Sequence, residues 1–176
     1  EVLNSMPMSK LFVPSKLRRD VSPSDPIYRT GGDVAYLQGA CIALHAALFR
    51  RIGGFDEAFF LYFEEEDLCL RARAAGARCS YDPGASVMHL WGTSIGKVEG
   101  LAAFHLGRSR SLFLRKWFGP RVGRATAVGV MLANLLQVTL LRVRLLFGGD
   151  ETLERRARGT AKHVDGLRDG LKASRS

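Results

Sequence analysis

The chain has 176 residues, and 47% of them are hydrophobic, which is enough apolar sequence for one folded domain and excludes wholesale disorder. Its 26 Lys and Arg outnumber its 17 Asp and Glu and give a net charge of +9. These basic residues show neither zinc-finger spacing nor interleaved aromatic residues, so we expect no nucleic-acid partner. Cys41, Cys69 and Cys79 lack CxxC spacing, which disfavours a disulfide framework or a zinc site and favours the cytoplasm.

The positive charge lies in the second half of the chain. Residues 1–100 contain 11 Lys and Arg against 12 Asp and Glu, whereas residues 101–176 contain 15 against 5. This asymmetry predicts an anionic partner for the second half, which is a membrane surface, a nucleic acid or a phosphorylated substrate, and the missing motifs make nucleic acid the weaker interpretation. The chain starts at Glu1 and shows no signal-peptide pattern, and we expect it to be a fragment of a longer protein.

The first elements in chain order are short. Residues 1–36 are rich in Pro, Ser and charge, which predicts an irregular connecting segment. The apolar run Leu37–Leu44 fits a buried strand. Ala46–Ile52 fits a short helix, which Gly53 and Gly54 end.

A second helix is predicted from Glu64 to Ala75, because its first turn is acidic, its later turns are basic and a glycine follows it. Two short strands, Arg78–Tyr81 and Ser86–Leu90, are expected on either side of the turn Asp82-Pro83-Gly84.

The sequence beyond about residue 100 has helical patterns. Ala102–Phe118 and Ala125–Leu146 are two predicted helices, and apolar residues at helical spacing from Leu153 to Leu171 indicate an amphipathic third. The stretch Ala125–Leu141 has 17 residues without a charge, which is marginal for a membrane span of about 20 residues. A buried or interfacial helix is therefore favoured there, and a membrane span stays open.

Six carboxylates within the twelve positions 56–67 are the most distinctive feature of the chain. Four of them are consecutive, from Glu64 to Asp67, and neighbouring like charges destabilise a helix. On a helix at most two can face one site, and Asp67 is placed to pair with Arg71. Two interpretations stay open: a solvated acidic helix start, or carboxyls partly desolvated by the flanking Phe and Tyr, whose raised pKa suits a general base.

Around these acids the chain resembles the bacterial family 2 glycosyltransferases, especially their rhamnosyltransferase-like branch. The resemblance rests on Gly-Gly-Phe-Asp-Glu at 53–57 and on Phe-Phe-Leu-Tyr-Phe-Glu-Glu-Glu-Asp-Leu-Cys-Leu-Arg at 59–71. It continues with Leu-Gln-Gly-Ala-Cys at 37–41, Pro-x-Ala-x-Val-x-His-x-x-Gly-x-Ser at 83–94 and the segment 109–116. The C-terminal domain of animal-type galactosyltransferases shares the Gly-Phe-Asp and Glu-Asp elements.

The resemblance implies an α/β fold, the C-terminal half of a GT-A mixed sheet followed by a helical tail. Residues 37–100 would form the acceptor-side catalytic part and residues 101–176 a basic helical extension. The implied reaction is an inverting transfer from a nucleotide-sugar to a cell-envelope or polysaccharide acceptor, including a lipid-linked one. Neither an Asp-x-Asp motif nor a Gly-rich phosphate loop occurs in the chain, so we expect these residues alone to lack the nucleotide-binding half and to be inactive.

The resemblance also implies roles for individual acids. Glu65 falls on the general base, although the family commonly has Asp there, and Glu64 is the supporting or alternative acid. His89 falls on a ligand of a divalent metal, Mg²⁺ or Mn²⁺; without the resemblance it would be a core histidine. Asp67 and Arg71 are expected to be a structural pair.

Four further residues are expected to bind substrate: Gly39, Ala40, Asp56 and Trp91. Asp56 would cap a turn or a helix and orient the acceptor loop, and Trp91 either stacks on a sugar or packs in the core.

Other functions remain open at this point. One is a non-catalytic, membrane-associated scaffold or binding module derived from a transferase, and another is a small basic nucleic-acid-binding protein. The basic tail could sit on an anionic membrane, pack as ordinary helices or form oligomer contacts. We expect a cytoplasmic protein, peripheral at the inner face of the plasma membrane.

Overall fold

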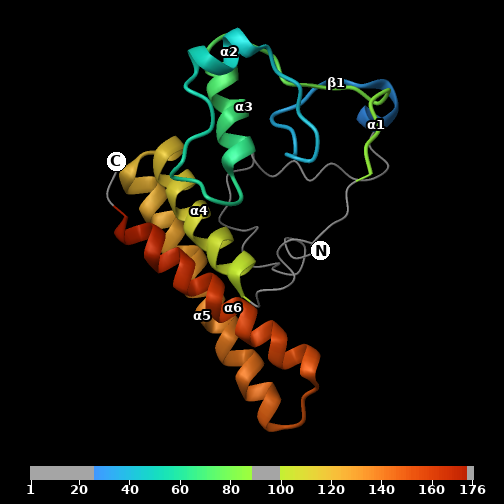
Figure 1. Ribbon diagram of the computed structural model, residues 1–176. Coiled ribbons are helices and arrows are strands. Elements are labelled where there is room, and N and C mark those ends of the chain that lie inside the picture. Colours follow the sequence, from blue (N-terminus) through green and yellow to red (C-terminus); the bar gives the residue numbers. More distant parts are fainter. Residues whose placement is uncertain (1–25, 89–99, 174–176) are drawn as a thin grey trace.

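Three long helices form the C-terminal part of the protein. The computed structural model describes residues 26–88 and 100–173. In it, α4 (Leu101–Phe118), α5 (Pro120–Leu146) and α6 (Glu151–Lys172) pack pairwise, and α5 and α6 form a hairpin beside α4 (Figure 1). The helices predicted beyond residue 100 are confirmed.

Local sequence sets the ends of these helices. Gly119, with φ of 81°, separates α4 from α5, and Pro120 occupies the first turn of α5, where its missing N–H costs no hydrogen bond. This proline starts α5 five residues before the predicted start at Ala125. The side chain of Asp150 accepts a hydrogen bond from the Leu153 amide (2.8 Å) and so caps α6.

Glycines allow the three helices to approach closely. A Cβ atom added at Gly107 of α4 would collide with the carbonyl oxygen of His163 in α6, and one at Gly166 of α6 would collide with that of Phe104. Gly123 of α5 lies in the same way against Leu114 of α4. The helix backbones are therefore in contact, and any side chain at these positions must push them apart.

The part before residue 89 is small. It contains α1 (Ile27–Thr30), β1 (Gly32–Asp33), α2 (Ala46–Arg51), α3 (Glu64–Ala74) and β2 (Ser80–Tyr81). β1 pairs antiparallel with β2. α2 and α3 match their predicted ranges closely, and α3 lies above α4 (Figure 1).

The predicted strand Leu37–Leu44 is wrong. Its residues are irregular, and backbone amides of Leu37 and Gly39 donate to side chains of α3 instead of to a neighbouring strand. Residues 86–88 of the predicted strand Ser86–Leu90 are also irregular, and Arg78–Tyr81 is a strand only at Ser80–Tyr81. The described residues thus form a mainly helical fold with one two-stranded sheet, which has less β-structure than the predicted α/β fold. The wider GT-A sheet stays a prediction.

Two glycines of α6 provide a matched test of the helix contacts. Gly166→Ala is expected to lower the free energy of unfolding by about 1–3 kcal/mol, because its methyl group meets the backbone of α4. Gly159→Ala meets nothing within 4 Å and is expected to raise it by about 0.5–1 kcal/mol, because alanine favours the helix. Urea denaturation of both variants measures the two changes, and equal effects would contradict the packing.

Candidate acidic helix site

The row of glutamates begins at a strained turn. Tyr62 and Phe63 both adopt left-handed backbone angles, with φ of 66° and 68°, immediately before Glu64 starts α3. This conformation costs about 1–3 kcal/mol for each non-glycine residue and is commonest at functional sites. The ring of Phe63 lies 5.0 Å from that of Phe113 in α4, a contact that offsets part of this cost.

Residues 34–39 run along one face of α3. The Val34 carbonyl accepts from Arg73 Nη1 (3.0 Å). The amide of Leu37 donates to Cys69 Sγ (3.5 Å), and the amide of Gly39 donates to Glu65 Oε1 (3.2 Å). Their partners on α3 are each one helical turn apart, so the segment runs antiparallel to the helix. This course brings Gly39, which Ala40 follows, against Glu65.

The loop before α3 is fixed to α4. Arg108 Nη1 donates to the Ala58 carbonyl and Ser109 Oγ to the Leu61 carbonyl, both at 2.8 Å. The buried ring of Phe59 lies 6.5 Å from Phe113. The loop that delivers the acids is therefore positioned by a helix more than forty residues later in the chain.

A fully buried carboxylate joins α3 to α4. Asp67 has no exposed side-chain surface, and its Oδ1 accepts from Lys116 Nζ (2.7 Å) and Trp117 Nε1 (2.9 Å). Its Oδ2 accepts from Arg71 Nε (2.7 Å), which is the ion pair that the spacing predicts. Arg71 Nη1 in turn donates to the Ile52 carbonyl (2.6 Å). Asp67 therefore fixes the rotation of α3 about its axis relative to α4.

Asp56 belongs to the same group of contacts. Lys116 Nζ also bonds its Oδ2 (2.6 Å), and its Oδ1 accepts from the Ala58 amide (3.0 Å), the turn cap expected for Asp56. Burial raises the pKa of Asp56, but the hydrogen bonds from Lys116 and Ala58 and the Lys116 charge hold it below its ordinary value. Asp56 lines a polar hollow with Glu57, Arg71 and Lys116, and that hollow does not include Glu64 or Glu65.

Burial changes the charge of the glutamate row. Burial raises the pKa of Glu66 to about 8, and the charges of Glu65 and Glu64 add to the rise. Burial and the charge of Glu65 likewise raise the pKa of Glu64. At neutral pH Glu66 therefore keeps its proton, which relieves the repulsion expected of four consecutive carboxylates. The Oε2 atoms of all three glutamates are buried without a hydrogen-bond partner among the described residues.

Two predicted site residues, His89 and Trp91, lie outside the described residues. Among those described, no three His, Cys, Asp or Glu side chains form a group that could hold a metal ion. The described part of the site therefore does not by itself fit a metal ion.

Some residues of the site have no sequence signal of their own. Glu66 occupies a position that the family motif leaves variable, and only burial in the folded chain distinguishes it. Ser109 and Lys116 lie in the segment 109–116. In the sequence, the resemblance of this segment to the family is the feature that connects α4 with the site.

No protein-family model and no solved structure matches the chain. Curated relatives match part of the chain. An N-acetylglucosaminyl-diphospho-decaprenol L-rhamnosyltransferase of Mycobacterium tuberculosis is 39% identical over 83 residues, 46% of this chain and 26% of the relative. Rhamnosyltransferase WbbL of Escherichia coli is 36% identical over 67 residues, 38% of this chain and 25% of the relative.

A pre-mycofactocin glycosyltransferase of Mycobacterium tuberculosis is 37% identical over 82 residues, 47% of this chain and 17% of the relative. The matched segment thus spans about a quarter or less of each of these three relatives. These similarities confirm the predicted resemblance to rhamnosyltransferase-like glycosyltransferases.

Glu66→Gln tests the burial of the glutamate row. Because the folded state holds the Glu66 proton up to a pH of about 8 and the unfolded state loses it near 4.5, wild-type stability should fall as pH rises between these values. The side chain of the variant cannot ionise. Its free energy of unfolding, relative to that of wild type, should therefore be higher at pH 8 than at pH 5. Urea denaturation at both pH values measures this, with exposed Glu57→Gln as the control. A difference independent of pH would contradict the raised pKa.

Proposed function

We propose that the chain is the acceptor-side part of an inverting, GT-A-type family 2 glycosyltransferase that uses a nucleotide-sugar to build a cell-envelope glycan. The supporting observation is the contact between Glu65 and the Gly39 amide, at the start of a helix whose sequence resembles rhamnosyltransferases. In this assignment residues 37–100 carry the acceptor site, and residues 101–176 hold it in place and extend it.

Glu65 is the general base of this proposal. The Gly39 amide holds Oε1 and thereby orients the side chain, while Oε2 is buried without a hydrogen-bond partner among the described residues. Glu65 takes the proton of an acceptor hydroxyl as that oxygen bonds to the anomeric carbon of the donor. The anomeric C–O bond to the nucleoside diphosphate breaks, and the diphosphate leaves with the electron pair, so the configuration inverts.

Glu64 and Glu66 support the base. Burial raises the pKa of both side chains, and the pKa of about 8 for Glu66 reduces the negative charge beside Glu65 at neutral pH. Gly39 and Ala40 contribute backbone to the acceptor side, where a glycine leaves room for a sugar next to the carboxylate.

Donor binding is assigned to sequence beyond these 176 residues. The chain lacks an Asp-x-Asp motif and a Gly-rich phosphate loop, and its matched segment is a small share of the relatives. A divalent metal, with His89 among its ligands, belongs to the same proposal and would neutralise the leaving diphosphate. The proposed location is peripheral, at the cytoplasmic face of the membrane, beside a lipid-linked or other saccharide acceptor.

Glu65→Gln in the natural full-length protein tests the proposal. Transfer from a panel of nucleotide-sugars that includes an activated L-rhamnose is measured in Mn²⁺. The variant is expected to lose at least about a hundredfold in kcat, because the amide cannot take a proton, with donor binding retained. Glu64→Gln should lose less, and the exposed Glu151→Gln on α6 should retain wild-type activity.

Two outcomes would contradict this assignment. Unchanged activity in Glu65→Gln, or a larger loss in Glu64→Gln, would move the base away from Glu65. Absence of transfer by the wild-type protein across the whole panel would contradict the proposed glycosyltransferase activity.

A further inference from the structure

The far end of the α5–α6 hairpin exposes a cluster of large apolar side chains. α4 has 18 residues and α5 has 27, so α4 can lie beside only part of the length of α5. The hairpin therefore projects beyond α4 (Figure 1). Near its end five apolar residues are 46–87% exposed, and we call them the tip cluster: Leu136, Leu140, Val143, Leu146 and Phe147.

The tip cluster is ordered along one face. Leu136, Leu140, Val143 and Phe147 follow each other at intervals of four, three and four residues, which places them on one side of a helix. The opposite side of α5 carries the buried residues Val130, Asn134 and Val138. Helix packing thus uses one face of α5 and leaves the other apolar face uncovered.

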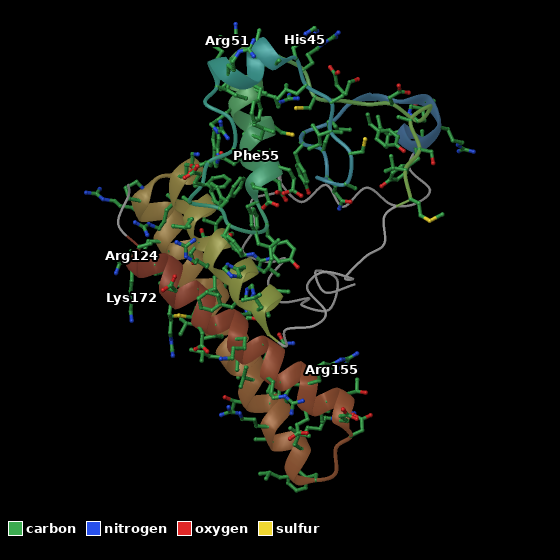
Figure 2. The ribbon with its side chains drawn as sticks, in the orientation of Figure 1. His45, Arg51, Phe55, Arg124, Arg155 and Lys172 are labelled. Atoms are coloured by element: carbon green, nitrogen blue, oxygen red, sulfur yellow. The ribbon has the colours of Figure 1, made fainter. Side chains whose placement is uncertain are left out.

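Basic residues surround this apolar face. At 100° per residue, Arg142 and Arg144 fall on either side of the line through Leu136 and Val143. Exposed Arg155 and Arg156 follow on α6, and Figure 2 shows Arg155 near the far end of the hairpin, opposite His45 and Arg51. An apolar stripe edged by arginines is the pattern of an interfacial helix, whose cations reach the lipid phosphates.

Two other occupants fit less well. α5 is long and apolar enough to cross a membrane, but a span would draw the attached α6 and its charged outer residues into the hydrocarbon. A second copy seated face to face on the same stripe would bring the arginines of both chains together.

We infer that the tip cluster inserts into the headgroup and acyl boundary of an anionic bilayer, with the flanking Arg142 and Arg144 on lipid phosphates. The excess of 15 Lys and Arg over 5 Asp and Glu in residues 101–176 provides the complementary charge. This inference rests on the proposed peripheral location but not on the transfer reaction. It specifies which residues of the protein would contact the membrane at that location.

Vesicle flotation of the chain tests the inference, without donor or acceptor. Wild type should float with phosphatidylcholine vesicles that contain phosphatidylglycerol and much less with pure phosphatidylcholine. Leu140→Ser combined with Phe147→Ser should weaken partitioning by about tenfold or more, since both changes remove inserted apolar surface. Val87→Ser combined with Val122→Ser removes valines 55% and 58% exposed outside the tip cluster and should float like wild type. Circular dichroism confirms that each variant is folded.

Several results would overturn it. Equal flotation of the tip variant and wild type, or no flotation of wild type, excludes insertion of the tip cluster. Resistance to alkaline carbonate extraction would indicate a membrane span instead. A dimer in sedimentation equilibrium that the tip variant abolishes would assign the surface to a second copy. None of these results depends on Glu65, so transfer activity and membrane binding can fail separately.

Discussion

The arrangement of the acidic helix depends on one buried carboxylate. Asp67 is withdrawn completely from solvent, and an isolated charge in that position would cost several kcal/mol. Its cost is offset because three side chains donate to it, Arg71 from its own helix and Lys116 and Trp117 from α4. Arg71 bonds one carboxylate oxygen of Asp67, and Lys116 and Trp117 of α4 bond the other. All three contacts therefore form together in only one rotation of α3.

That rotation decides which acids face which surroundings. With Asp67 directed to α4, the face of α3 that contains Glu65, Cys69 and Arg73 meets the segment 34–39, and Glu65 contacts the Gly39 amide. Glu66 is partly buried and keeps its proton near neutral pH. A row of four acids that is unfavourable on a free helix is thus divided. Asp67 is ion-paired, Glu66 is protonated, Glu65 is oriented by the Gly39 amide, and burial raises the pKa of Glu64.

The sequence predicts the features that depend on near neighbours. The charge order along its turns located α3, helical spacing located α6, and the four-residue interval located the Asp67–Arg71 pair. It failed at Leu37–Leu44, because a short apolar run is equally compatible with a strand and with an irregular segment packed on a helix. The contacts of Lys116 with Asp67 and of Ser109 with Leu61 cross about fifty residues, and no local pattern encodes them. The roles of Glu64 and Glu65 came from resemblance to a family, and they stay predictions.

Asp67→Asn measures how strongly Asp67 orients α3. The amide keeps the shape but removes the carboxylate charge with which Arg71 pairs and one of the two carboxylates with which Lys116 pairs, so we expect a loss of about 3–5 kcal/mol in the free energy of unfolding. Amide hydrogen exchange should accelerate in residues 64–74 and 34–39 more than in α6. Exposed Asp165→Asn should stay within about 0.5 kcal/mol of wild type. An Asp67→Asn variant as stable as Asp165→Asn, with α3 exchange unchanged, would contradict the account.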